Sequence, residues 1–182
     1  MKHSVRELYE EIGTIQKGSS RPSYDSISHG ILINENIPSG RICLDLGCGG
    51  GHYLNVLEER FVQVICVDIA KSNVKKAMPR AKISTSCFVV GDAGRLPFVS
   101  GVFDFVLFTE VIEHLPNPSE GLSEIRRCLS AKGRALITTP NRAEPLRFVL
   151  YTILGPLQRS LGLDFMNVFK SSFLDIYGIL TK

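Results

Sequence analysis

Short apolar runs alternate with helical patterns along most of the chain. Apolar residues recur on one helical face over residues 4–16, and a second short helix is expected over residues 26–36. Five short apolar runs follow, at 41–46, 62–67, 87–90, 103–108 and 134–139. Strands that alternate with helices predict βαβ units. We therefore expect an α/β fold with a doubly wound, mainly parallel sheet that is covered on both faces.

The helix before the last of these runs has the clearest signals. Asn117-Pro118-Ser119 forms a cap-like start. Apolar residues then recur at helical spacing, and a glycine is expected to end the helix. These residues are Leu122, Ile125, Leu129 and Gly133.

The first apolar run leads into a glycine-rich turn with the sequence LDLGCGGG at residues 44–51. Gly47, Gly49 and Gly51 let the backbone turn without a Cβ atom and approach a ligand closely where the next helix begins, near His52. Glycine turns also end strands for purely structural reasons. The loop alone is therefore a modest signal for a cofactor.

Acidic residues follow the next two runs. Asp68 stands 21 residues after Gly47, a spacing at which a carboxylate reaches ribose hydroxyls. Asp92 follows the third run, where it could accept a hydrogen bond from the exocyclic amine of adenine. The glycines fall as GxGGG, unlike the GxGxxG of a pyrophosphate cradle, and Asp45 would repel an anion. A cationic ligand therefore fits this loop better than a dinucleotide.

Four motifs in this order resemble the class I S-adenosylmethionine-dependent methyltransferase family, typified by the ubiquinone and menaquinone biosynthesis enzymes. They are LDLGCGGG, VICVDIA, VVGDAGRLPF and FDFVLFTEVIEHL, and the resemblance covers residues 42–141. It implies a seven-stranded doubly wound sheet with S-adenosylmethionine as the cofactor.

The resemblance also implies which residues bind that cofactor. The three glycines would pack against its methionine part, Asp68 would bind the ribose, and Asp92 with Ala93 would hold the adenine. Asp45 would contact the methionine amino group or order the loop. The full expected set is Asp45, Gly47, Cys48, Gly49, Gly51, Asp68, Ile69, Asp92, Ala93 and Thr109.

Candidate catalytic residues follow the fourth run. If the acceptor is a hydroxyl group, a base must take its proton, and His114 with Glu110 is the expected catalytic pair. Glu110, Glu113 and His114 also resemble the acidic cluster of some metal-assisted quinone O-methyltransferases. The alternative is structural, with Glu110 capping the loop. We favour a structural or positioning role over metal binding and expect no metal.

The organisation predicted is one methyltransferase domain over residues 1–182. Residues 1–40 would form a helical lid, 41–141 the cofactor-binding core and 142–182 a helical roof. Residues 173–180 could make one strand and hardly two, so we expect the sheet to lack part of the usual C-terminal strand hairpin. The fifth strand would then be an exposed edge, open to a homodimer, unless a partner, a swapped segment or the C-terminal residues cover it.

Composition and charge limit the partners and the cellular compartment that we expect for this chain. The net charge of +3 comes from scattered Lys and Arg residues, so no nucleic-acid partner is expected. Five cysteines without CxxC spacing suit reduced thiols in the cytoplasm. The longest apolar run, 148–154, is too short for a transmembrane segment.

The expected function is methyl transfer to a small-molecule acceptor, of which an apolar molecule is one option. The motifs are compatible with O-, N- and C-methylation. Two alternatives remain. One is a cofactor-binding pseudoenzyme or interaction module with an incomplete acceptor site, and the other is an RNA or protein methyltransferase.

Overall fold

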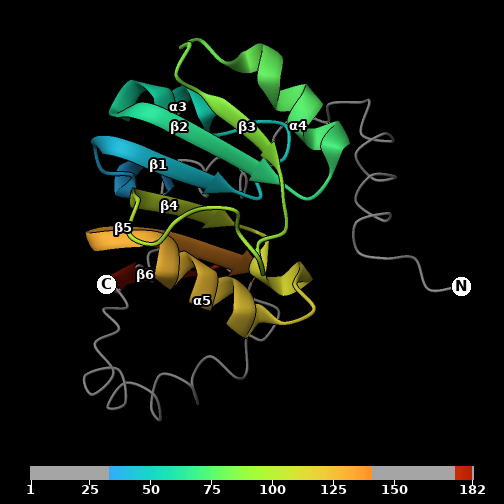
Figure 1. The fold of residues 1–182 in the computed structure, drawn as a ribbon, viewed down its shortest axis with the longest axis vertical. Coiled ribbons are helices and arrows are strands. Elements are labelled where there is room, and N and C mark those ends of the chain that lie inside the picture. Colours follow the sequence, from blue (N-terminus) through green and yellow to red (C-terminus); the bar gives the residue numbers. More distant parts are fainter. Residues whose placement is uncertain (1–32, 141–174, 182) are drawn as a thin grey trace, which may run out of the picture.

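The computed structural model describes residues 33–140 and 175–181 (Figure 1). Six strands are present in these ranges: β1 (Gly40–Leu46), β2 (Phe61–Asp68), β3 (Cys87–Val90), β4 (Phe103–Thr109), β5 (Leu129–Pro140) and β6 (Asp175–Thr181). The helices are α3 (Leu54–Arg60), α4 (Lys71–Ala77) and α5 (Pro118–Cys128), with 3₁₀ turns at Met78–Arg80 and Ile112–His114. Each of the five predicted strands is confirmed.

The strands form one sheet in the order β3-β2-β1-β4-β5-β6. Strands β1 to β5 are parallel, and β6 is antiparallel to β5 (Figure 1). This is the doubly wound, mainly parallel α/β architecture expected from the sequence. In the described ranges a single strand follows β5. It pairs with β5 from Arg134 to Pro140, so C-terminal residues cover the edge that the dimer hypothesis left open.

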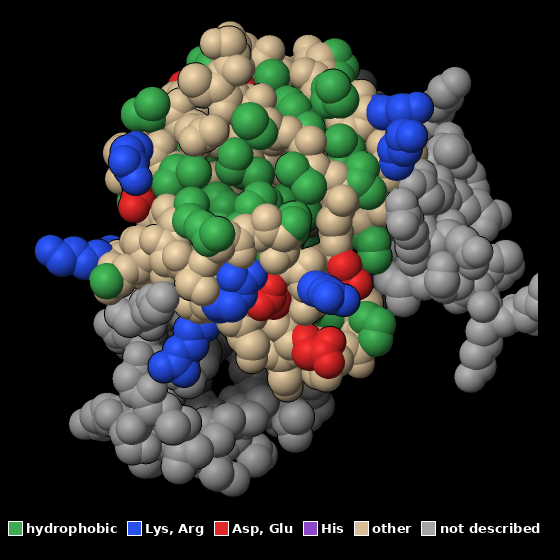
Figure 2. All heavy atoms as spheres, viewed as in Figure 1, with side chains coloured by type: hydrophobic (Ala, Val, Ile, Leu, Met, Phe, Trp, Pro, Cys, Tyr) green, Lys and Arg blue, Asp and Glu red, His purple; other side chains and the backbone are tan. Residues whose placement is uncertain are grey.

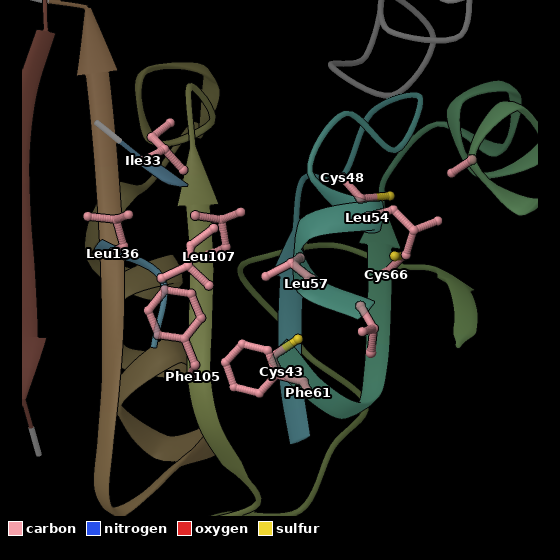
Figure 3. Close-up of a cluster of buried hydrophobic side chains, with 13 residues drawn as sticks. Ile33, Cys43, Cys48, Leu54, Leu57, Phe61, Cys66, Phe105, Leu107 and Leu136 are labelled. Atoms are coloured by element: carbon pink, nitrogen blue, oxygen red, sulfur yellow. The ribbon is translucent and has the colours of Figure 1, made fainter. Parts of the chain in front are cut away.

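Side chains alternate between two cores because successive residues of a strand point to opposite faces. Cys43 of β1 belongs to the core under α3, whereas Leu44 and Leu46 belong to the core under α5. Figure 3 shows the first core, where Leu54 and Leu57 of α3 lie over the strands with no exposed surface. Burying a leucine fully stabilises the fold by about 1.5–3 kcal/mol, so this spacing fixes the helix on the sheet.

The second core faces the viewer in Figure 2, where apolar side chains gather above α5 and charged groups of both signs surround them. Ile125 and Cys128 of α5 are fully buried in it. The connection between β3 and β4, residues 91–102, contains no helix. Phe98 of this connection packs edge to face on Phe103, with ring centroids 5.2 Å apart. An aromatic loop residue thus takes the place of a crossover helix on this face.

The predicted end of α5 is wrong. The helix ends at Cys128, and β5 begins at once with Leu129, five residues before the predicted strand. Gly133 lies inside β5, where a Cβ atom would come 2.7 Å from the carbonyl oxygen of Phe103. The register of β4 and β5 is irregular between Phe103 and Phe105. Gly133 therefore permits a close backbone approach and does not end a helix.

Helix α5 begins where the sequence predicts, but Asn117 makes a different hydrogen bond from the expected cap. Pro118 is the first helical residue, as its fixed backbone angle favours. The Asn117 side chain does not cap the helix; its amide donates to Glu120 Oε1 at 2.9 Å.

The predicted lid and roof fall mainly outside the described residues. Of the lid, residues 33–36 form a helical turn, with Ile33 fully buried in the core under α3. Of the roof, only β6 is described. In the described ranges, no helix is long and apolar enough to cross a membrane.

Candidate functional site

The candidate residues converge at the carboxyl ends of the parallel strands. The strand order reverses between β1 and β4, because the chain runs outward from β1 to β3 and then returns to β4. In open α/β sheets ligands bind at such a switch point, where the loops after the strands diverge. The glycine loop follows β1, and Glu110 follows β4. The topology therefore brings residues 45 and 110 to one site.

The glycine loop, residues 47–51, needs its glycines for different reasons. Gly47 has φ 77° and Gly49 has φ 52°, in the left-handed region that other residues rarely adopt. A Cβ atom on Gly47 would collide with Cγ2 of Val111. A Cβ atom on Gly49 would meet nothing within 4 Å. Gly47 is thus closely packed against Val111, whereas Gly49 faces open space.

Backbone bonds hold the loop against β2. The amides of Gly47 and Cys48 donate to the carbonyl oxygen of Val67 at 2.8 and 3.0 Å. Gly51, with φ 78°, packs against Ala77 of α4, where a Cβ atom would lie 3.2 Å from the Ala77 Cβ. Helix α3 begins at Leu54, two residues after the predicted start near His52.

Asp68 at the end of β2 anchors the loop and the next helix together. Its Oδ2 accepts the amide of Gly49 at 2.8 Å. Its Oδ1 accepts the amide of Ala70 at 2.9 Å and the side-chain amide of Asn73 at 3.1 Å. A carboxylate has about four lone-pair sites, so roughly one remains for a ligand. Asp68 is only 7% exposed, so its position is fixed by these three bonds within the protein.

Asp45 is the more unusual carboxylate. It is 2% exposed, and its Oδ2 has no hydrogen-bond partner among the described residues. Burial, and secondly the charge of Asp68, raises the pKa of Asp45 to about 7. A buried carboxylate without a partner is costly unless a cation or donor reaches it. The arrangement therefore suits a positively charged ligand group.

The thiols near this carboxylate are not nucleophiles. A hydrogen bond with Cys66, together with burial, raises the pKa of the Cys48 thiol far above its ordinary value. Burial likewise raises the pKa of Cys43. Both side chains stay protonated and pack in the core under α3. Cys48 can line a ligand site, but it cannot act as a thiolate there.

The loop after β3 places Asp92 on the surface and Ala93 in the second core. Asp92 Oδ1 accepts the amide of Gly94 at 2.8 Å, which shapes a tight turn. The carboxylate therefore stabilises its own loop and is still exposed to solvent.

Sequence reasoning missed the pair that holds this loop in place. Arg127 of α5 donates to the carbonyl oxygens of Phe98 and Leu96 at 2.6 and 3.1 Å. It also forms a salt bridge with Glu124, whose Oε2 accepts the amide of Leu96 at 2.7 Å. The bond with Arg127 lowers the pKa of Glu124. Charged residues on a helix surface give no sequence signal for such contacts nearly 30 positions away.

The loop after β4 carries the predicted catalytic side chains. Glu110 Oε1 accepts the hydroxyl of Thr138 at 2.8 Å. His114 is 44% exposed, and its Nε2 lies 3.6 Å from Glu113 Oε1. Glu113 Oε2 also accepts the hydroxyl of Thr139 at 3.2 Å. In the part of the chain that the structure describes, no group of three or more acidic, His or Cys side chains is placed to hold a metal ion.

A family model described as a methyltransferase domain matches residues 44–137, slightly more than half of the chain. The chain belongs to this methyltransferase family. The matched residues run from β1 to β5 and include the glycine loop, both buried carboxylates and the loop after β4. The resemblance inferred from the four motifs is confirmed.

Two relatives and one solved structure illustrate the similarity. Ubiquinone biosynthesis O-methyltransferase of Idiomarina loihiensis is 32% identical over 108 residues, covering 57% of this chain and 44% of that protein. Ajmaline N-methyltransferase of Rauvolfia serpentina is 36% identical over 102 residues, covering 53% and 35%. This methyltransferase domain thus spans less than half of the length of these two curated relatives.

Among solved structures, the complex of the Haloferax volcanii Trm112 methyltransferase activator with a methyltransferase is similar with a TM-score of 0.64. That match is 25% identical and covers 75% of this chain and 60% of that chain. The methyltransferase in that structure is therefore bound to a protein partner, the Trm112 activator.

The residues present fit S-adenosylmethionine, the cofactor that the family implies. The unpartnered Oδ2 of Asp45 suits an ammonium group, and the space beside Gly49 admits a ligand against the backbone. Asp68 retains acceptor capacity for a hydroxyl group. The pyrophosphate of a dinucleotide at the glycine loop would instead lie near the buried carboxylate of Asp45, which disfavours it.

Proposed function

We propose that this chain is the cofactor-binding and catalytic core of an S-adenosylmethionine-dependent methyltransferase that acts on a small-molecule acceptor. One observation carries the proposal. Asp45 is a buried carboxylate with an unpartnered oxygen next to the glycine loop, and its pKa is raised to about 7. A cationic ligand group there would stabilise its ionised form.

The cofactor-binding roles follow from the position of each residue at the edge of the sheet. Asp45 would hold the ammonium group of the methionine part, with the glycine loop packed against the rest of that part. Asp68 would bind the ribose, and the loop after β3 the adenine. The proposed set is Asp45, Gly47, Cys48, Gly49, Gly51, Asp68, Ile69, Asp92, Ala93 and Thr109.

S-Adenosylmethionine supplies an electrophilic methyl group on a cationic sulfur. The protein then has to hold an acceptor in line with that methyl group, and such positioning alone lowers the barrier substantially. For a hydroxyl acceptor, His114 is the proposed base, because its imidazole is half-exposed at the switch point. Glu113 would orient the ring from 3.6 Å. Glu110 accepts a hydrogen bond from the Thr138 hydroxyl, which favours a positioning role for Glu110.

A small-molecule acceptor is supported by the relatives. The names of the two relatives describe O-methylation in ubiquinone biosynthesis and N-methylation of ajmaline. On the face shown in Figure 2, Lys and Arg side chains are interspersed with Asp and Glu and form no basic stripe. RNA binding would call for such a stripe.

Calorimetric titration with S-adenosylhomocysteine, S-adenosylmethionine and NAD tests the proposal. We expect micromolar binding of the first two and none of NAD, with Asp68→Ala weakening binding by about 1–3 kcal/mol. Asp104→Ala is the matched control, since Asp104 also accepts two backbone amides, those of Arg41 and Ile42, but lies at the opposite end of the sheet. Loss of the Asp104 carboxylate should leave the affinity for both sulfur compounds unchanged.

Two outcomes would contradict parts of the proposal. A folded chain that binds neither sulfur compound would overturn the cofactor assignment. A chain that binds S-adenosylhomocysteine but transfers no methyl group to a panel of small phenols and amines would support the pseudoenzyme alternative instead.

A further inference from the structure

The residue after β4 has a strained backbone. Glu110 has φ 55° and is the non-glycine residue with a positive φ in the described ranges. A side chain in this region is strained and persists only where the surroundings enforce it. The strain therefore calls for a partner that holds Glu110 in place.

Thr138 of β5 holds Glu110 through two hydrogen bonds. Its carbonyl oxygen accepts the amide of Glu110 at 3.1 Å, and its hydroxyl donates to Glu110 Oε1 at 2.8 Å. Thr138 is fully buried, and it faces Thr109, the last residue of β4, in the strand register. Backbone and side chain of Glu110 are thus both bound to one rigid strand.

The turn at Glu110 sets the position of the next residue. Val111 lies directly against the Cα atom of Gly47, so that no Cβ atom would fit between them. Gly47 in turn donates to Val67 of β2. A continuous chain of contacts therefore runs from Thr138 through Glu110 and Val111 to the first residue of the glycine loop.

We propose that Thr138 is a positioning residue for the cofactor: through Glu110 it holds Val111 against Gly47 and so keeps the glycine loop in its ligand-binding shape. This inference rests on the proposed function for its consequence, which is tighter cofactor binding. Its structural part, the restraint on the loop, stands without any ligand. Glu110 then acts through Val111 and is not the proton acceptor.

The neighbouring pair provides a matched control. Thr139 also donates its hydroxyl to a glutamate of the same loop, Glu113, at 3.2 Å. That bond is exposed, and neither residue is among the contacts of a Cβ built on Gly47. Loss of a threonine hydroxyl at 139 should therefore leave the glycine loop unchanged.

Hydrogen exchange of the full chain without cofactor tests the restraint directly. In Thr138→Val, which keeps the shape but removes the hydroxyl, the amides of Gly47 and Cys48 should exchange about tenfold faster, while the β2 amides do not change. Thr138→Ser should restore protection, and Thr139→Val should match the wild type. Val111→Ala removes the contact itself and should accelerate the same two amides. The double variant Thr138→Val with Val111→Ala should add little to Val111→Ala alone.

Binding of S-adenosylhomocysteine is the second readout. We expect about tenfold weaker binding for Thr138→Val and recovery in Thr138→Ser, the amount that one lost buried hydrogen bond corresponds to. Unchanged Gly47 and Cys48 exchange in folded Thr138→Val would overturn the inference. If Thr138→Val does not fold, unchanged exchange in Val111→Ala would overturn it equally. Absence of binding to the wild type would refute the proposed function, and the exchange result would still decide whether the restraint exists.

Discussion

The two halves of the carboxyl edge of the sheet are built differently. At the ends of β1 and β2, Asp45 and Asp68 are buried, and the loop between them is held mainly by backbone amides. At the end of β4, His114 is half-exposed, and Glu113 accepts the hydroxyl of Thr139 and lies 3.6 Å from the imidazole of His114. The first half thus holds two buried carboxylates, whereas the second exposes His114 to solvent.

The buried half gives up stability where Asp45 stands. A neutral, well-packed residue in place of Asp45 would make a more stable core, because a buried charge without a partner is costly. Local rules of stability are commonly broken at functional sites. The buried half thus suits a constant cofactor, and the open half suits an acceptor that differs among relatives.

Gly47→Ala should give the largest effect. The new methyl group would collide with Val111 and force a left-handed backbone, so the free energy of unfolding should fall by about 2–4 kcal/mol. Urea denaturation measures it. Combining the change with Val111→Ala should recover part of the loss.

Gly49→Ala is the contrasting variant, since its Cβ would enter open space. It should destabilise the protein by only about 1 kcal/mol, from backbone strain, and yet weaken cofactor binding strongly. Equal losses of stability in the two variants would contradict the distinction between a packed and a ligand-facing glycine.

Asp45→Asn should come next, with opposite effects on stability and binding. The folded-state pKa of Asp45 is raised to about 7, whereas the unfolded value is near 4. Ionisation of Asp45 therefore destabilises the cofactor-free protein progressively as the pH rises from about 4 to about 7. The asparagine variant should be more stable than the wild type at pH 8, by on the order of 3 kcal/mol, and lose this advantage by pH 4.

The same variant should bind S-adenosylhomocysteine more weakly, because its ammonium group loses a counterion. Parallel unfolding curves at pH 4, 6 and 8 check the stability part. A stability difference that does not change with pH would show that folding does not shift the pKa of Asp45.

Asn73→Ala should have a smaller effect within the buried half. It removes one of the three donors to Asp68 and leaves the two backbone bonds. We expect a loss of about 1 kcal/mol in stability and a similar loss in cofactor affinity. Thermal denaturation and calorimetry measure the two. No effect on affinity would mean that the backbone donors orient the carboxylate without help.

His114→Ala should have the smallest effect on the fold. Because the side chain is 44% exposed, stability and cofactor affinity should stay within about 0.5 kcal/mol of the wild type. Turnover of a hydroxyl acceptor should fall, because the proposed base is lost. His52→Ala, at an exposed histidine beside the glycine loop, is the control and should keep the wild-type turnover. Normal turnover in His114→Ala would remove the proposed base.

Much of the buried half could be predicted from the sequence. The five parallel strands follow from apolar runs, and the glycine loop and Asp68 follow from local motifs with fixed spacing. Such features depend on residues close together in the chain. Asp45 was expected to meet a cation from its motif, but its unpartnered oxygen could be seen only once the surrounding core was known.

The contacts between distant segments could not be predicted. Thr138 lies 28 positions from Glu110, and Arg127 lies 31 from Leu96. A threonine inside a strand and an arginine on a helix surface are both ordinary, so no pattern marks them. Gly133 was assigned to a helix end because glycine commonly ends helices, whereas its actual role depends on the carbonyl of Phe103.

A nuclear magnetic resonance titration of the ¹⁵N-labelled chain with S-adenosylhomocysteine tests the assignment of the cofactor site. The largest amide shifts should fall at residues 47–51, 68–70 and 92–94, which are the loops after β1, β2 and β3. Saturable binding that shifts amides elsewhere and leaves these three loops unchanged would contradict the assignment of the cofactor site.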